Sequence, residues 1–309
     1  MLGAPIAERL QAAGHPLVVY NRTREKAEPL LAAGARLAFT PRDVGRAATG
    51  GVVFTLVSDG RALERVLFGR QGLARGLGAG ALLVDLSTIS PAESRAFAER
   101  LGATGVHFVD AALGGSVDAA RNGRLIAYVG GDDADVARAR PLLERFARRV
   151  EHLGPVGLGT SMKLVNNLLT LSYVALAGEA LALAEGLGLD RKRAIDLLLD
   201  GGGYSRLFEQ KRLAFEERRY PPQFRLRLAE KDLRLVVHAA HSTQHEAGLA
   251  REAGRLFSEA ARAGHGEEDF AAVFESALAR RPRRRGAAAP SPAETTVPET
   301  PPGPVPPPP

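Results

Sequence analysis

The sequence predicts an α/β fold built on a doubly wound parallel sheet, followed by an all-helical domain and a disordered C-terminal tail. In the first half, short apolar runs alternate with amphipathic helical patterns, which is typical of a parallel sheet. Beyond residue 155 no convincing strand pattern occurs, and long helical patterns dominate. From residue 280 the chain is rich in arginine and proline and cannot bury apolar area. We therefore expect three parts, at residues 1–155, 156–279 and 280–309.

The individual elements follow from apolar periodicity and from the turns that interrupt it. The predicted strands are 17–20, 37–39, 52–57, 81–87, 108–112 and 125–129, and helices are predicted at 6–13, 24–33, 41–48 and after the third strand. The second part carries helical patterns at 161–187, 191–199, 207–215, 228–240 and 246–263. The first of these helices is apolar on more than one face, which predicts burial at an interdomain or subunit interface.

The chain opens on a helix, whereas a Rossmann-type nucleotide-binding unit begins with a strand and a glycine-rich turn. Gly3 stands where the last glycine of Gly-x-Gly-x-x-Gly would stand, directly before that helix. We therefore expect a Rossmann-type domain that lacks its first strand and first two glycines, through a misassigned start or a truncation. That strand is central in the usual order, so its loss exposes neighbouring strand edges. An unrelated fold with a coincidental Gly3 is the weaker alternative.

The residues after the strand at 17–20 bear on the choice of dinucleotide. NAD-binding proteins usually carry an acidic residue there for the ribose hydroxyls, and an acid would repel a 2′-phosphate. This chain instead has Asn21, Arg22 and Thr23, a cation flanked by uncharged donors that suit such a phosphate. The sequence therefore favours NADP over NAD, although the same residues also fit a solvated turn in which Thr23 caps a helix.

Composition limits the other functions. Cysteine is absent, which excludes disulfides, thiolate nucleophiles and Cys-ligated metals, and we expect no metal site. The net charge of +6 falls to +3 without residues 280–309, whose five arginines include the run Arg283 to Arg285, so nucleic acid is not an expected partner. No apolar run reaches bilayer length and no signal peptide is evident, which predicts a cytoplasmic protein without membrane contact.

The stretch from Gly157 to Asn167, GLGTSMKLVNN, carries the strongest candidate site. Two glycines and small polar residues lead into an apolar helical run, which predicts a helix entrance. Lys163 and Asn167 are four residues apart and therefore lie on one face of that helix, where both reach a single small polar ligand.

With the other motifs, the chain resembles the β-hydroxyacid dehydrogenase family, which includes 3-hydroxyisobutyrate dehydrogenase and semialdehyde reductases. The stretch from Gly157 matches the family's Gly-x-Gly-x-x-x-Lys-x-x-Asn-Asn in full. The other similar stretches are Gly3-Ala4-Pro5-Ile6-Ala7, Asp85-Leu86-Ser87-Thr88 with Pro91, and Lys231-Asp232-Leu233. The resemblance covers the chain from Gly3 to about Ala279 and implies at least a dimer.

The resemblance implies an NADP-dependent enzyme that transfers hydride between nicotinamide and a small 3-hydroxy acid or semialdehyde. Lys163 would then exchange the hydroxyl proton with the substrate, and Asn167 would hold the substrate by a hydrogen bond. Contacts with the cofactor are implied for Gly3, Thr88, Lys231 and the strand end at Leu56, Val57 and Ser58.

One loop departs from the family pattern. Where the family reads Asp-Ala-Pro-Val-Ser-Gly-Gly, this chain reads Asp110-Ala111-Ala112-Leu113-Gly114-Gly115-Ser116. The serine that contacts the substrate carboxylate is therefore replaced by Gly114. Either the backbone amides of Gly114 and Gly115 bind the carboxylate, or Ser116 reaches it from a shifted position.

Three alternatives compete with this interpretation. The 6-phosphogluconate dehydrogenases resemble Lys-x-x-His-Asn, but this chain has Asn166 at the histidine position. Imine reductases share the fold and generally replace the lysine, which Lys163 argues against. A non-catalytic binding module with the same fold would suit the missing phosphate cradle and the basic cluster from Arg280 to Arg285, but not the retained lysine.

Overall fold

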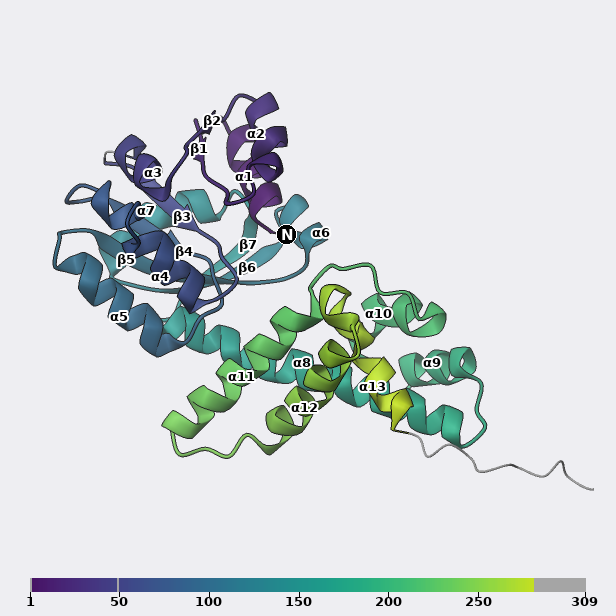
Figure 1. Ribbon diagram of the computed structural model, residues 1–309. Coiled ribbons are helices and arrows are strands. Elements are labelled where there is room, and N and C mark those ends of the chain that lie inside the picture. The colour runs from purple at the N-terminus through teal and green to yellow at the C-terminus, as the bar shows by residue number, and fades with distance from the viewer. Residues whose placement is uncertain (1, 49, 281–309) are drawn as a thin grey trace, which may run out of the picture.

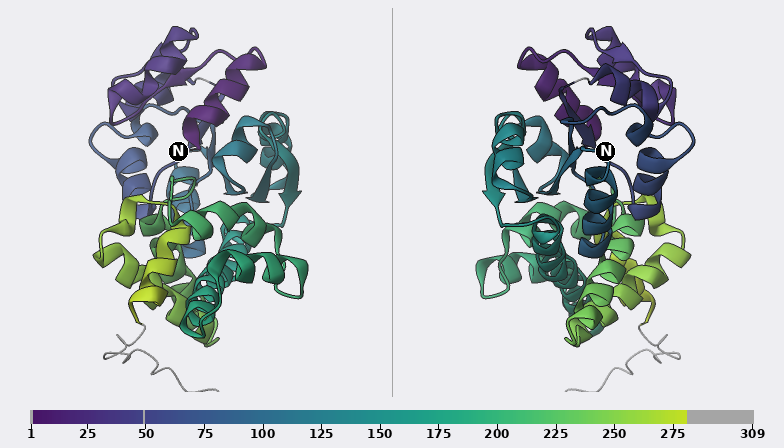
Figure 2. Two further views of the ribbon diagram at one scale, coloured as in Figure 1. Left: turned by 90° about the vertical axis from the view of Figure 1, so that its right-hand side faces the viewer. Right: turned by 90° about the vertical axis from the view of Figure 1, so that its left-hand side faces the viewer.

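The structure, a computed structural model, describes residues 2–48 and 50–280 and consists of a sheet-bearing half and a helical half (Figure 1). Views turned by 90° show the helical half stacked against one end of the sheet-bearing half (Figure 2). Apart from Arg280, the predicted disordered tail lies outside the described residues. Arg280 follows the last helix and forms an ion pair with Glu259.

The main sheet has five strands in the order β3-β4-β5-β6-β7. They are β3 (Val52–Thr55), β4 (Leu82–Asp85), β5 (His107–Gly114), β6 (Leu125–Gly130) and β7 (Ala147–His152). β3, β4 and β5 run parallel, with Thr55 opposite Asp85 and Asp85 opposite Asp110. Three polar residues therefore lie side by side at the carboxyl edge of these strands, where doubly wound sheets bind ligands.

Helices cover both faces of this sheet. The helices of the sheet-bearing half are α1 (Gly3–Ala12), α2 (Glu28–Ala32), α3 (Pro41–Ala47), α4 (Gly60–Phe68), α5 (Pro91–Gly102), α6 (Val117–Arg121) and α7 (Asp133–Leu143). Leu82 of β4 packs with Ile6 of α1 on one face, and Leu83 packs with Leu63 of α4 on the other. Successive residues of a strand point to opposite faces, so one buried strand serves two cores. The doubly wound α/β fold predicted from the sequence is confirmed.

Two short strands stand apart from the main sheet. β1 (Val18–Val19) and β2 (Arg36–Leu37) pair parallel as a sheet of their own. In the usual doubly wound order, the first strand lies between the strands that correspond to β1 and β3. The residues that the structure describes contain no strand at that position, in agreement with a sequence that opens on α1.

One strand pair of the main sheet departs from the parallel pattern. β6 runs antiparallel to β5, with Asp110 opposite Gly130. The connection between them, residues 115–124, contains only the short helix α6, whereas a parallel crossover needs about a dozen residues or more. β7 was also missed, because its sequence ARRVEH exposes two arginines and shows little apolar alternation.

The helical half contains α8 (Leu158–Gly186), α9 (Arg191–Asp200), α10 (Arg206–Glu217), α11 (Leu226–Ser242), α12 (Gly248–Arg262) and α13 (Val273–Ala279). α8 packs against α11, α12 and α13 through buried residues that include Leu171, Val174 and Leu181. The rings of Phe215 and Phe274 meet edge to face at 5.7 Å within the same core. All five helices predicted here are present, and α13 is an addition.

α8 is the central helix of the molecule and has two contrasting sides. By length and composition it could cross a membrane, as no other helix of the described residues could. One side is buried in the helical core, and the other exposes leucines, with Leu169 71%, Leu176 62% and Leu183 63% accessible. The sequence thus correctly predicted a helix that is apolar on more than one face.

Candidate active site

The start of α8 is anchored to the sheet by a buried carboxylate. Asp110 of β5 accepts hydrogen bonds from the backbone N–H of Gly157 at 2.7 Å and of Thr160 at 2.6 Å. The first N–H groups of a helix lack partners within the helix, and an anion there is favoured by the helix dipole. Burial raises the pKa of Asp110, and these two amides oppose that rise. Asp110 therefore fixes the position of α8 relative to the carboxyl edge of the sheet.

Lys163 lies in the second turn of α8 and is half-buried. No hydrogen bond or ion pair of its Nζ occurs within residues 2–48 and 50–280. Burial lowers the pKa of Lys163 below its usual 10.5, the Asp232 carboxylate opposes this, and the Lys231 ammonium adds to it. The chain thus places a lysine of weakened basicity beside a buried carboxylate, which is the property required of a group that exchanges protons near neutral pH.

A continuous hydrogen-bonded path links α8 to the sheet through α11. Asn167 Nδ2 donates to Asp232 Oδ2 at 2.8 Å, and both side chains are buried. Lys231 Nζ contacts Asp232 Oδ1 at 2.8 Å and donates to the carbonyl oxygen of Thr88 at 2.5 Å. The structure therefore brings together four residues singled out from the sequence, Lys163, Asn167, Lys231 and Thr88, although they come from three separate segments.

The strand ends beside Thr88 are held by a second polar cluster. Asp85 Oδ1 accepts from Thr55 Oγ1 at 2.7 Å and from Ser87 Oγ at 2.8 Å, and Ser87 Oγ in turn accepts from the backbone N–H of Val57 at 2.9 Å. Asp85 is fully buried, its Oδ2 has no partner within the described chain, and burial raises its pKa to about 6. This cluster fixes the backbone from Leu56 to Ser58.

The remaining cofactor candidates lie along the same edge. The N-terminus of α1 faces the end of β3, because a Cβ on Gly3 would lie 3.8 Å from Leu56 Cδ2. After β1, Asn21 Oδ1 accepts from the backbone N–H of Thr23 at 3.0 Å, and Arg22 is exposed. Arg22 has no ion pair with another described residue. An exposed cation at this turn can bind a phosphate of a dinucleotide, and the N–H groups at the start of α1 are a second group suited to a phosphate.

The predicted substrate loop contains Gly114, Gly115 and Ser116, and each has a different role in the backbone. Gly114 ends β5, and Gly115 follows with φ 129°, a conformation that favours glycine. Ser116 caps α6, its Oγ accepting from the backbone N–H of Ala119 at 3.2 Å. Of the two possibilities that the sequence leaves open, this arrangement favours a site formed at Gly114 and Gly115.

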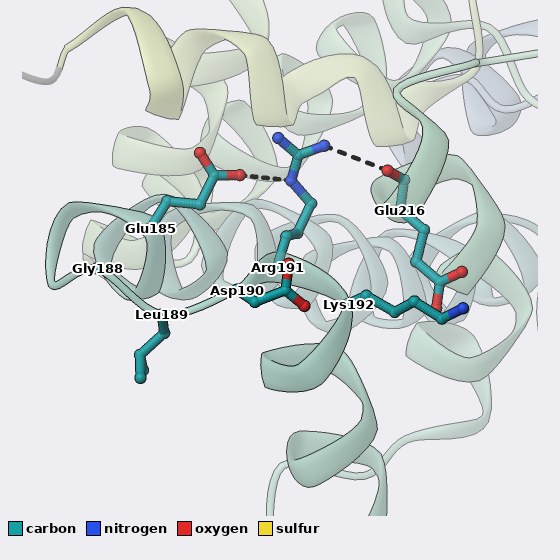
Figure 3. Close-up of a pocket in the computed structure, with 7 residues that line it drawn as sticks. All are labelled: Glu185, Gly188, Leu189, Asp190, Arg191, Lys192 and Glu216. Atoms are coloured by element: carbon teal, nitrogen blue, oxygen red, sulfur yellow. Dashed lines mark hydrogen bonds and ion pairs between the residues drawn. The ribbon is translucent and has the colours of Figure 1, made fainter.

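A pocket of about 570 Å³ opens at the opposite end of α8 (Figure 3). Its lining residues are Glu185, Gly188, Leu189, Asp190, Arg191, Lys192 and Glu216. Glu185 lies 22 residues after Lys163, or about 33 Å along the helix at 1.5 Å per residue. The Arg191 guanidinium already binds the Glu185 carboxylate and the carbonyl oxygen of Glu216. This pocket is therefore remote from the candidate site, and two of its charged side chains, Glu185 and Arg191, bind each other.

Together, the fold and the side chains define an oxidoreductase-like protein, in which a dinucleotide-type sheet joins a helical domain bearing a half-buried lysine. Residues 1–154 match the family model described as the NAD binding domain of 6-phosphogluconate dehydrogenase. Residues 157–277 match the one described as NAD-binding of NADP-dependent 3-hydroxyisobutyrate dehydrogenase. The chain belongs to the β-hydroxyacid dehydrogenase family of NAD(P)-dependent oxidoreductases.

Individual relatives agree with this membership. Glyoxylate/succinic semialdehyde reductase 2 of Arabidopsis thaliana, a chloroplastic protein, is 31% identical over 92% of this chain and 78% of its own length. The solved 3-hydroxyisobutyrate dehydrogenase of Salmonella typhimurium is 28% identical, with TM-score 0.81 over 89% of this chain and 95% of that one. Psf3, solved with NADP+ and 2-OPP, is 28% identical, with TM-score 0.80 over 89% and 96%.

Sequence reasoning missed several polar residues of the site. Asp110 and Asp232 were quoted as parts of motifs but given no role, although both are buried carboxylates that hold the other residues in place. The signal for Asp110 was an acid inside an otherwise apolar predicted strand, residues 108–112, because a buried carboxylate needs hydrogen-bond partners. Tyr128 of β6, whose hydroxyl donates to Asn166 Oδ1 at 3.3 Å, offered no such signal, because it lies in an ordinary apolar strand pattern.

Proposed function

We propose that this protein is an NADP-dependent oxidoreductase that transfers hydride between nicotinamide and a small 3-hydroxy acid or a semialdehyde, with Lys163 as the proton donor and acceptor. The observation that carries the proposal is the placement of Lys163. It is half-buried, its pKa is lowered by burial, and it shares a helix face with Asn167, whose hydrogen bonds lead through Asp232 and Lys231 to Thr88.

Reduction requires one hydride and one proton. When bound, NADPH supplies the hydride that adds to the carbonyl carbon. The Lys163 ammonium binds the carbonyl oxygen, stabilises the negative charge that develops there, and donates the proton that completes the hydroxyl. In the oxidative direction the neutral Lys163 amine accepts that proton. Because the pKa of Lys163 is lowered, both of its protonation states are accessible with less change of pH than for an exposed lysine.

The surrounding residues position the reactants. Asn167 holds the substrate through its amide, and Asp232 fixes the orientation of that amide. The carboxyl edge at Leu56, Val57, Ser58 and Thr88 faces the nicotinamide, and Lys231 approaches it from the helical domain, residues 156–279. Gly114 and Gly115 bind the acid group of the substrate through backbone amides, with Ser116 as the flanking residue.

NADP is the proposed dinucleotide because of the turn after β1. Arg22 is an exposed cation without an ion pair among the described residues, beside the uncharged donors Asn21 and Thr23. Arg22→Ala is expected to weaken NADPH binding about 10- to 100-fold, the effect of losing a charged hydrogen bond, and to leave NADH binding unchanged. Arg24→Ala, which removes a neighbouring cation stacked on Phe39, is the control. Equal losses for both dinucleotides would contradict the assignment.

We also propose a homodimer, formed through the exposed face of α8. Leu169, Leu176 and Leu183 recur every seven residues and so form one stripe along the helix, which suits the same stripe of a second copy. Leu176→Glu is expected to convert the dimer to a monomer in sedimentation velocity, whereas Leu213→Glu, at an equally exposed leucine of α10, should not. A cytoplasmic location stays a prediction from the sequence.

The reductase assignment is tested by following NADPH consumption with succinic semialdehyde and glyoxylate. The wild-type protein is expected to turn over at least one of them, and Lys163→Ala to lower kcat by about 10²- to 10⁴-fold, the usual contribution of a general acid. NADPH affinity should be unchanged. Lys192→Ala, at the far end of α8, controls for the loss of a lysine. Full activity of Lys163→Ala would overturn the assignment.

A further inference from the structure

The space beside Gly114 is filled by a phenol from the neighbouring strand. A Cβ built on Gly114 would lie 3.1 Å from Tyr128 Oη and 3.2 Å from Tyr128 Cε2. Tyr128 pairs with Ala112 in the antiparallel ladder, so Tyr128 and Gly114 are diagonal neighbours on one face of the sheet. The hydroxyl of Tyr128 therefore lies in close contact with the place where a side chain at position 114 would begin.

The same hydroxyl reaches the helix that carries Lys163. Tyr128 Oη donates to Asn166 Oδ1 at 3.3 Å, and Asn166 Nδ2 donates to Asn167 Oδ1 at 3.3 Å. Asn166 and Asn167 follow Lys163 by three and four residues, so all three lie on one face of α8. Both hydrogen bonds are long, and an incoming anionic oxygen that accepts from Tyr128 replaces a weak bond with a stronger one.

The chemistry of the phenol suits an acceptor ligand. Tyr128 is half-buried, and burial raises its pKa, with the Arg149 guanidinium opposing this effect, so the hydroxyl keeps its proton. A protonated phenol donates one hydrogen bond and carries no charge that would repel an anion. At this position the donor lies beside the glycine pair of the loop, while the Lys163 ammonium lies one helical turn from Asn166.

We propose that Tyr128 is a specificity-determining residue, whose hydroxyl donates a hydrogen bond to the acid group of the substrate in the space left free by Gly114. This inference rests on the proposed function, because it takes the substrate to be a small acid bound beside Lys163. It adds a side-chain donor to a loop in which Gly114 and Gly115 offer only backbone.

Steady-state kinetics with saturating NADPH compare succinic semialdehyde with butanal, which has a methyl group in place of the carboxylate. Tyr128→Phe is expected to raise KM for succinic semialdehyde about 10- to 100-fold, the loss of one hydrogen bond to a charged group, with little change in kcat. KM for butanal should not change. Tyr173→Phe, which removes a hydroxyl bonded to Gly203 in the helical half, is the control. Equal effects on both aldehydes, or none, would overturn the proposal.

A double variant that moves the hydroxyl from residue 128 to residue 114 tests whether the two positions share one space. Tyr128→Leu alone should bind succinic semialdehyde as poorly as Tyr128→Phe. In the double variant Gly114→Ser/Tyr128→Leu, the new hydroxyl enters the volume that the phenol vacates, and KM is expected to return toward the wild-type value. Gly114→Ser alone forces Tyr128 to move, since the added Cβ lies 3.1 Å from its hydroxyl. No improvement of the double variant over Tyr128→Leu would contradict the inference.

Binding of succinate, followed by isothermal titration calorimetry with the NADPH-loaded protein, separates this inference from the reductase assignment. Weaker binding to Tyr128→Phe than to wild type supports Tyr128 as the donor whether or not the protein turns over aldehydes. If wild type consumes NADPH with aldehydes while succinate binds both proteins equally, the inference fails and the proposed function stands. If no aldehyde is turned over but succinate binding depends on Tyr128, only the reductase assignment fails.

Discussion

The start of α8 and its outer side differ in which kinds of side chain they bury and which they expose. At its start, polar groups are buried and bound to one another: Asp110 holds the first turn, and Asn167 bonds to Asp232. Along its outer side and toward its end, large apolar groups such as Leu176 and Leu183 face outward, and Glu185 binds Arg191 in the pocket of Figure 3. α8 thus carries buried polar groups near its start and exposed leucines along its outer side, both of which depart from the usual placement of polar and apolar residues.

Burying charged groups and exposing leucines both cost free energy, and each therefore suggests a function. Asp110 and Asp232 are buried and Lys163 is half-buried. Removing such groups from water is unfavourable unless they find hydrogen bonds or opposite charges, so a cluster of them is more typical of a site than of a stabilising core. Exposing a row of leucines forgoes the free energy of burial, about 25 cal/mol per Å², so the row indicates a partner surface. This contrast supports both proposals, a catalytic site at the start of α8 and a dimer formed through its outer side.

The largest expected change in stability comes from removing the Asp110 carboxylate that holds the start of α8. Asp110→Ala leaves the backbone N–H groups of Gly157 and Thr160 buried without an acceptor. At about 1.5–3 kcal/mol for each hydrogen bond to a charged group, the free energy of unfolding should fall by roughly 3–6 kcal/mol. Urea denaturation followed by circular dichroism measures this change.

The matched substitution lies at the other end. Asp190 caps α9 in the remote pocket, accepting from the backbone N–H of Arg193 at 2.9 Å, but it is exposed. Asp190→Ala should therefore lower the free energy of unfolding by about 1 kcal/mol only, the usual worth of a helix cap. Equal losses for Asp110→Ala and Asp190→Ala would remove the distinction between the two ends.

A second, smaller effect concerns the pH dependence of stability. The pKa of buried Asp85 is raised to about 6 from the usual 3.8, so the folded protein holds this proton more tightly than the unfolded chain. The contribution of Asp85 to the free energy of unfolding is therefore most favourable below pH 3.8 and is lost as pH rises to about 6. Relative to wild type, Asp85→Asn should thus gain on the order of 3 kcal/mol between pH 3.5 and pH 8.

The measurement is a set of urea unfolding curves for both proteins across that pH range. A constant difference between wild type and Asp85→Asn would show that Asp85 ionises as freely in the folded protein as in the unfolded chain. Because Asp85 fixes Ser87 and Val57, NADPH binding to Asp85→Asn checks that the carboxyl edge keeps its shape.

The smallest expected effect is a change in the pKa of Lys163 while the lysine itself is kept. The Asp232 carboxylate raises the pKa of Lys163 against the effect of burial. Asp232→Asn keeps an acceptor for Asn167 but removes the negative charge, so the pKa of Lys163 should fall further. The pH at which the reduction rate declines should then move downward. Glu230→Gln, on the same helix but bound to Arg234, should leave that pH in place.

Much of the architecture could be predicted from the sequence because it depends on local patterns. Apolar periodicity located β1 to β6, though not β7, and five helices of the helical half, and the spacing of Lys163 and Asn167 placed both on one helix face. The reversal of β6 could not be predicted in this way, because strand direction depends on how the chain returns between Gly114 and Leu125.

The hydrogen-bond partners within the candidate site also could not be predicted from the sequence. Asp232 meets Asn167 across 65 positions of the chain, and Tyr128 meets Asn166 across 38. Such contacts follow from the packing of α8 on β6 and α11, and no pattern in either segment indicates them alone. The absence of a side chain at Gly114 was visible, but that a phenol from another strand fills the space required the folded chain.

The central claim, that Lys163 is the proton donor, is tested most directly by the pH dependence of kcat for reduction of a semialdehyde by NADPH. Because the ammonium form is required and its pKa is lowered, kcat of the wild type should be constant at low pH and fall as pH rises through a value below 10.5. In Lys163→Ala this decline should be absent from the residual rate. The same decline in both proteins would contradict the account.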